Sequence, residues 1–258
     1  MIVLPKPKFR IPNFAVCGLR FGNESSRFGP TYAGHMVDVD AVTRWGEIPP
    51  PQDDDALSAA LLDDSSSSPY PLNEEINFKV ALWQGDLTAL KADALVNSNN
   101  QELNERSGVS GQIFAAAGPQ LEEACTKLGS CRPGDAKATR GFRLPAKHVV
   151  HTVPPQWTDK GDAEAVLEAC YTRSFEVARK LASSTIVFTC VKTSDAPREL
   201  VAHVAVRTIR RLLEQHGRSL QLIIFAMRPQ VVPASTTTYH QPMQPRTTSL
   251  CHHRAFGP

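Results

Sequence analysis

The sequence lacks several features that would assign it to a class at once. No apolar run approaches the ~20 residues that span a bilayer, and prolines interrupt the N-terminal stretch MIVLPKPKFRIPNFAVCGLR, where a signal peptide needs a continuous apolar core. The net positive charge is small too, since the 28 lysines and arginines are nearly balanced by 26 acidic residues. The composition therefore gives no reason to expect a general attraction to nucleic acid or anionic membrane. We therefore expect an unsecreted protein with no transmembrane segment, and the sequence gives no evidence for DNA binding.

Cysteine pairs at the spacing of disulfide or metal motifs are also missing. The six cysteines form no CxxC pair and lie mostly in apolar or helical stretches, which favours reduced thiols inside the cell, in the cytoplasm or nucleus. Cys251 is followed directly by His252 and His253, but adjacent residues alone do not make a tetrahedral site. His148 and His151 lie three apart in a predicted strand and point to opposite faces. We expect no metal and no cofactor.

Polar and proline-rich segments flank a more apolar centre. Residues 1–72 contain IPPPQDDDA and DDSSSSPYP, and residues 229–258 are rich in proline and threonine. Such segments bury too little apolar surface to offset the entropy of ordering, so we predict disorder for most of 1–72 and for 229–258, around a folded domain over 73–228. The stretch MVDVDAVTRWGEI in the first segment is interpreted as solvated, with a short docking motif as the alternative.

The central region alternates between strand and helix patterns. Short apolar runs predict strands over 78–85, 92–98, 136–144, 147–154, 185–191 and 220–227. Helical spacing predicts helices over 110–128, with Ser110 as N-cap, over 162–182, and over 200–217, ended by Gly217. The second of these has an inward stripe made of Val166, Leu167, Cys170, Phe175, Val177 and Leu181. This pattern predicts an α/β fold with a largely parallel sheet.

Three loops follow predicted strands, where α/β sheets bind ligands: 85–88, 97–110 and 189–200. The second runs into a helix N-terminus, whose unpaired N–H groups and dipole suit phosphate, and the amides of Asn99 and Asn100 suit ribose hydroxyls. From composition alone, asparagine before a helix is more often a turn or cap, and Asp86 can cap a turn as well.

Three segments together, GDLTALKADALVNSNNQEL, SGVSGQIFAAAGPQLEEAC and GDAKATRGFRLPAKHVVHTV, resemble the macro domain, the ADP-ribose-recognition module. The resemblance implies a three-layer α/β/α sandwich with a mixed, largely parallel sheet. Details on either side resemble a member of this family in which a lipid-binding CRAL-TRIO domain follows the macro domain. Only 31 residues follow Met227, so the chain is expected to be a truncated version of such a protein.

The resemblance also implies a binding site. Asp86 would hold the adenine amino group, Leu87 would add a backbone contact, and Asn100 would contact the distal ribose. The phosphates would lie against two loops, the first of which includes three further contact residues, Gly108, Val109 and Ser110. ADP-ribose or an ADP-ribosylated protein is the implied partner.

Several positions depart from the family pattern. Arg106 and Ser107 replace two glycines of a triple glycine, and the arginine would either narrow the entrance or face phosphate. Ser110 stands where hydrolytic members carry aspartate, and a serine hydroxyl is a poor general base. The second phosphate loop, VKTSDAPREL, has no glycine and contains Asp195, whose charge would repel a diphosphate. Pro154 replaces a further glycine. No closing helix follows the last strand, which would leave an apolar strip uncovered.

Three functions follow from these departures. The first is a non-catalytic, weak or degenerate binder of ADP-ribose or a related nucleotide. The second is an interaction scaffold that has lost the ligand, and the third, opposed by Ser110, is an ADP-ribosyl hydrolase. Two smaller signals have structural interpretations: Cys190 as a buried thiol rather than a nucleophile, and the arginines of the last helix as a solvated face or a site for acidic partners, namely Arg207, Arg210 and Arg211.

Overall fold

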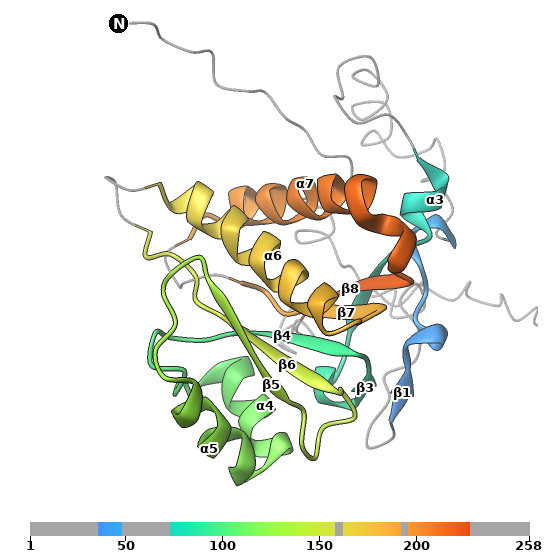
Figure 1. Cartoon of the computed structure of the whole chain (residues 1–258). Helices are drawn as coiled ribbons and strands as arrows, with labels where there is room; N and C mark the ends of the chain where they lie inside the picture. The colour runs from blue at the N-terminus through green and yellow to red at the C-terminus, as the bar shows by residue number, and fades with distance from the viewer. Residues whose placement is uncertain (1–35, 48–72, 158–161, 192–195, 228–258) are drawn as a thin grey trace, which may run out of the picture. The chain divides into compact units, whose positions relative to one another are not determined.

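The computed structural model describes residues 36–47, 73–157, 162–191 and 196–227 (Figure 1). Within these ranges a six-stranded sheet has the order β2-β8-β7-β4-β6-β5. Every neighbouring pair is parallel except β5 and β6. The strands are β2 Val80–Gln84, β4 Ala94–Ser98, β5 Ala136–Arg140, β6 His148–Thr152, β7 Thr185–Phe188 and β8 Leu222–Met227.

Helices cover both faces of this sheet (Figure 1). Successive strand residues point to opposite faces, so Leu95 and Ile224 join one apolar cluster while Val96 and Ile223 join the other. The first cluster packs under α4 and α5, and the second packs under α6 and α7. The α-helices are α3 Glu74–Asn77, α4 Gly108–Ala117, α5 Pro119–Leu128, α6 Ala163–Lys180 and α7 Arg198–His216. The predicted three-layer α/β/α sandwich is confirmed.

The helix predicted over 110–128 is in fact two helices. Gly118 adopts a φ of 82°, which favours glycine, and Pro119 then begins α5 at its first position, where its missing N–H costs nothing. Ser110 is not the N-cap that was predicted, because α4 begins at Gly108 and its N-cap is Ser107. The inward stripe of α6 is also corrected at its end, since Leu181 is among the exposed large apolar residues.

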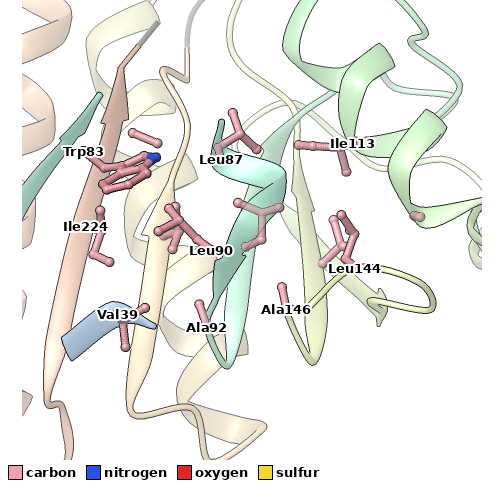
Figure 2. Packing of buried hydrophobic residues seen from close by; sticks show 14 of the residues in the cluster. Val39, Trp83, Leu87, Leu90, Ala92, Ile113, Leu144, Ala146 and Ile224 are labelled. Atoms are coloured by element: carbon pink, nitrogen blue, oxygen red, sulfur yellow. The ribbon is translucent and has the colours of Figure 1, made fainter. Parts of the chain in front are cut away.

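Residues 36–47 are part of the folded domain, which corrects their interpretation as a solvated segment. β1 (Val37–Asp38) pairs in parallel with β3 (Leu90–Lys91). Three valines of this segment are buried in the first apolar cluster, and Figure 2 shows Val39 in that cluster with Trp83 and Ile224. Short 3-10 turns complete the described elements: η1 Val39–Ala41, η2 Trp45–Glu47, η3 Leu87–Ala89 and η4 Gly217–Ser219.

The last strand does not expose the apolar strip that was expected after it. In β8, Leu222 to Ala226 are buried and Met227 is half-buried. The closing helix itself falls on residues from 228 onward, outside the described ranges, as does most of the predicted disorder. In the part of the chain that the structure describes, no helix is long and apolar enough to cross a membrane.

Candidate functional site

The loop after β2 places Asp86 at the surface. Its Oδ1 accepts hydrogen bonds from the backbone N–H of Thr88 at 2.9 Å and from the Thr88 hydroxyl at 2.6 Å, so the side chain caps η3. Leu87 is 7% exposed and packs into the first apolar cluster, which leaves its backbone as the group a ligand can reach. Among the described residues no donor contacts Oδ2 of Asp86, which leaves this oxygen available to an amino group.

The loop after β4 is held closed by its asparagines. Asn99 is buried, and its Oδ1 accepts from the backbone N–H groups of Asn100 at 2.8 Å and Glu105 at 3.0 Å. Asn100 is half-buried and exchanges two bonds with Asn104: its Nδ2 donates to Oδ1 at 2.6 Å, and its own Oδ1 accepts from the backbone N–H at 2.9 Å. Each amide group of Asn100 therefore makes one bond within the loop, which leaves one Nδ2 hydrogen and one Oδ1 lone pair for another partner.

This loop leads directly into α4, a helix of ten residues. The side chain of its N-cap Ser107 makes no capping hydrogen bond. Gly108 is exposed with a φ of 55°, and Val109 is half-buried against the first apolar cluster. A Cβ on Gly111 would lie 2.1 Å from the Arg106 carbonyl oxygen, so glycine is needed there. The Glu105 carboxylate accepts from the Ser107 backbone N–H at 2.7 Å. The loop thus presents a helix N-terminus without a Ser107 side-chain cap, and a helix N-terminus favours an anion.

Ser110 faces the interior rather than the surface. It is 4% exposed, its Oγ donates to the Glu105 carbonyl at 2.9 Å, and it accepts from Asn97 Nδ2 at 3.0 Å. The hydroxyl therefore ties the loop to β4.

Arg106 lies over the helices that follow. Its guanidinium carbon is 3.5 Å from the centroid of the Phe114 ring, and its Nη2 is 3.3 Å from Glu122 Oε1. The cation–π contact and the ion pair fold the side chain back onto α4 and α5. Of the two alternatives raised by the sequence, a phosphate contact would require the side chain to leave both partners.

Beneath the loop lies a buried polar network centred on His151. Its Nε2 is 3.1 Å from Thr139 Oγ1 and 3.5 Å from Cys125 Sγ, and its Nδ1 is 3.5 Å from Asn97 Nδ2. Burial, reinforced by the Arg106 charge, lowers the pKa of His151 to about 4, and burial raises the pKa of Cys125 to about 11. Both groups are thus neutral near pH 7. The network supports the loop, and sequence reasoning missed it because its members come from four separate elements.

The third loop is described only at its ends. Lys192 to Asp195 lie outside the described residues, so the predicted repulsion by Asp195 stays a prediction. Pro197 is the N-cap of α7. The interpretation of Cys190 as a buried thiol is wrong, because Cys190 is exposed at the surface.

The arginines of α7 are ion-paired rather than simply solvated. Arg207 contacts Glu164 at 2.9 Å, and Arg211 contacts Glu168 at 2.7 Å, which joins α7 to α6. Arg210 pairs along its own helix with Glu214 at 2.8 Å. These charges are already used inside the domain.

The fold and this loop geometry define a class. A family model described as "Macro domain" matches residues 96–205, and a crystal structure of the macro domain of ganglioside-induced differentiation-associated protein 2 (GDAP2) is 35% identical. That structure aligns over 75% of this chain and 90% of its own, with a TM-score of 0.66. The chain belongs to the macro-domain family.

Particular relatives extend the likeness. A "Protein GDAP2 homolog" from Nematostella vectensis is 38% identical over 198 residues, which cover 75% of this chain and 39% of the relative. Human ganglioside-induced differentiation-associated protein 2 is 36% identical over 74% of this chain and 40% of its own length. The chain thus spans about two fifths of these relatives. A Trypanosoma brucei macrodomain solved in complex with ADP-ribose is 35% identical over 57% of this chain and 63% of its own, with a TM-score of 0.54.

Proposed function

We propose that this chain binds ADP-ribose, or a related nucleotide, weakly and without hydrolysing it. The carrying observation is the loop 97–110, which leads from β4 into the N-terminus of α4 and contains the half-buried Asn100. A helix N-terminus favours phosphate, and an amide suits a ribose hydroxyl. The similar macrodomain of Trypanosoma brucei, solved with ADP-ribose, supports the ligand class.

Weak binding follows from the bonds that a ligand would have to replace. Asn100 already gives one Nδ2 hydrogen and one Oδ1 lone pair to Asn104, at 2.6 and 2.9 Å, so a ribose has to use the remaining hydrogen or lone pair or replace one of these bonds. Asp86 keeps Oδ1 on Thr88 and has only Oδ2 for an adenine amino group. Where a ligand replaces a bond within the protein, the free energy of the lost hydrogen bond cancels most of that of the bond gained.

Absence of hydrolysis follows from Ser110. Attack of water on an anomeric carbon needs a base near the water, and this position holds a hydroxyl that donates to the Glu105 carbonyl. A side chain that is 4% exposed with its hydrogen committed cannot accept a proton from that water. We therefore assign recognition rather than turnover to the site, in a protein of the cytoplasm or nucleus.

A second candidate is an interaction scaffold that keeps the fold without the ligand. The self-bonded pair Asn100 and Asn104 favours it, because the loop is complete without a nucleotide. So does Arg106, which is held by Phe114 and Glu122 instead of facing the loop. The whole protein's partners would then be proteins.

Calorimetric titration of the full chain with ADP-ribose separates the two candidates. We expect a dissociation constant between about 10 μM and 1 mM, at least ~10-fold weaker in Asn100→Ala. The matched variant Asn104→Ala removes the acceptor that holds Nδ2 of Asn100, so its affinity should be unchanged or higher. No heat at millimolar ADP-ribose would reject the binder and leave the scaffold.

The hydrolase is tested separately. A protein substrate carrying a single ADP-ribose is incubated with excess chain, and released ADP-ribose is measured. We expect release at the uncatalysed rate. Release at enzyme-like turnover that is lost in Asn100→Ala would overturn the assignment of Ser110.

A further inference from the structure

The two edge strands of the sheet, β2 and β5, differ in whether their outer sides are covered. Outside β2, Arg44 forms an antiparallel bridge with Ala81 and donates from Nη1 to the Phe78 carbonyl at 3.2 Å. At the opposite side, β5 pairs only with β6, and no described residue pairs with its outer side (Figure 1). One edge is capped by the chain itself, and the other is open in the part of the chain that the structure describes.

The register of β5 identifies the backbone groups on that open side. Gly141 N–H donates to the Lys147 carbonyl at 2.8 Å, and Thr139 lies opposite Val149 two residues earlier. In an antiparallel ladder alternate residues face the partner, so Ala138 and Arg140 turn their N–H and C=O groups outward. An edge of this kind is a template for one more strand.

Positive charge surrounds one end of this strand. A surface hollow of about 730 Å³ is lined by Arg140, Phe142, Lys147 and His148 among others, and none of the described residues that line it carries a carboxylate. Lys147 is paired with Asp93, but Arg140 has no carboxylate partner among the described residues. The side chain of Arg143 lies against Gly118, between α4 and α5. The ammonium of Lys137 donates to the carbonyl oxygens of residues 128 and 130, so its charge is directed away from the outer side of β5.

An exposed aromatic ring completes the surface. Phe142 is 37% exposed and has a φ of 53°, a conformation that bulky residues rarely adopt. The turn around it is fixed, because Leu144 N–H donates to the Gly141 carbonyl at 3.0 Å and a Cβ on Gly141 would strike the Ala146 carbonyl oxygen. The fold thus holds Phe142 outward beside the open strand.

We propose that the β5 edge binds an extended acidic segment of a partner protein as an added strand. The outward backbone groups of Ala138 and Arg140 pair with the peptide backbone, the Arg140 guanidinium contacts its carboxylates, and Phe142 contacts an apolar side chain. A nucleic acid would use the cations alone. The unpaired amides select a peptide, and the absence of lining carboxylates selects an acidic one.

The test uses the full chain and a blocked peptide of about eight alternating aspartate and valine residues, enough to pass along β5. Amide chemical shifts locate the binding and titration gives its affinity. We expect shifts centred on β5 and a dissociation constant below about 1 mM. Arg140→Glu should weaken binding at least ~10-fold, whereas Arg179→Glu, on the exposed end of α6, should leave it unchanged.

Backbone pairing is tested from both sides. Ala138→Pro removes an outward N–H and is tolerated at an edge strand, and it should weaken binding at least ~10-fold. If this variant fails to fold, the same peptide with alternate amides N-methylated tests the pairing on the unchanged chain, with an equal loss expected.

Several results would overturn the proposal. They are binding of a lysine–valine peptide as tight as that of the acidic one, indifference to N-methylation, absence of binding at about 1 mM peptide, and tighter binding once residues 51–66 are deleted. The last would assign the edge to this chain's own acidic segment, which contains Asp53, Asp54 and Asp55. Concentration-dependent dimers that Arg140→Glu abolishes would assign it instead to a second copy of the chain and reject the partner peptide.

Discussion

His151 links the stability of the domain to pH. It is fully buried, with Thr139, Cys125 and Asn97 around its ring nitrogens, and burial together with the Arg106 charge lowers its pKa to about 4. In the unfolded chain its pKa is about 6.5. Below that value the unfolded state binds a proton that the folded state does not bind. The contribution of His151 to the free energy of unfolding is therefore fully present above about pH 6.5 and decreases as the pH drops towards 4.

His151→Gln should remove this dependence. In the wild-type chain we expect the free energy of unfolding to fall by up to ~1.4 kcal/mol per pH unit between about pH 6 and pH 4, and the variant should flatten that slope while lowering stability at pH 7. Urea unfolding at several pH values measures both. An equally steep slope in the variant would show that other groups cause it.

Asp93 lies directly before β4, at the end of that strand opposite the loop 97–110. Burial alone would raise the pKa of its carboxyl, but hydrogen bonds from Lys147 at 2.7 Å and from the hydroxyl and backbone of Ser184 hold it well below the usual range. Because the folded-state pKa is lowered, the stabilisation is present above about pH 4 and is lost as the pH falls further.

We expect Asp93→Asn to cost about 2 kcal/mol at pH 7, since it leaves buried donors poorly paired, and the gap from wild type should narrow below about pH 4. The matched change Glu176→Gln breaks an exposed pair with Arg173 at 2.8 Å and should cost less than about 0.5 kcal/mol. Denaturant titrations of the three proteins give these differences. A gap that widens in acid would contradict the assignment.

The residues of the candidate site differ in how far the sequence could place them. Asn100 follows a predicted strand, so its position in a strand-end loop was predictable from order alone. The position of Arg106 was not, because its partner Glu122 comes beside it only when the chain folds back at Gly118. The inward direction of Ser110 likewise depends on Asn97, which lies in another element.

At the scale of elements, periodicity located the strands and the two long helices because each buries a regular face. The break at Gly118 was missed, although glycine followed by proline is a signal for one. Segment 36–47 was missed because only three valines carry it and their partners lie far along the chain. Val37, for example, pairs with Leu90.

A cavity in that segment tests its contribution. Val42 is 3% exposed in the first apolar cluster, and Val42→Ala should lower the free energy of unfolding by about 1–3 kcal/mol. Met36→Ala, on the same segment but 74% exposed, should change it by less than about 0.5 kcal/mol. Thermal or urea unfolding measures the difference. Equal losses of stability in the two variants would contradict the burial of residues 36–47 in the domain.

At the scale of the whole domain, one sheet separates two apolar clusters. Its strands supply side chains alternately to both, as Leu95 and Val96 do from β4. Leu121 of α5 is fully buried on one side, and Leu167 of α6 is 1% exposed on the other. Since neither helix layer can keep its apolar face buried without the sheet, the two clusters should unfold together.

Leu121→Ala and Leu167→Ala should each lower the free energy of unfolding by about 2–5 kcal/mol, and in the double variant the two losses should add within about 0.5 kcal/mol, because the side chains lie on opposite faces. Circular dichroism and tryptophan fluorescence should follow one shared transition in each protein. Fluorescence reports on both clusters, since Trp83 lies in the first and Trp157 packs against the second. Two separate transitions in either single variant would mean that one helix layer can detach while the sheet persists.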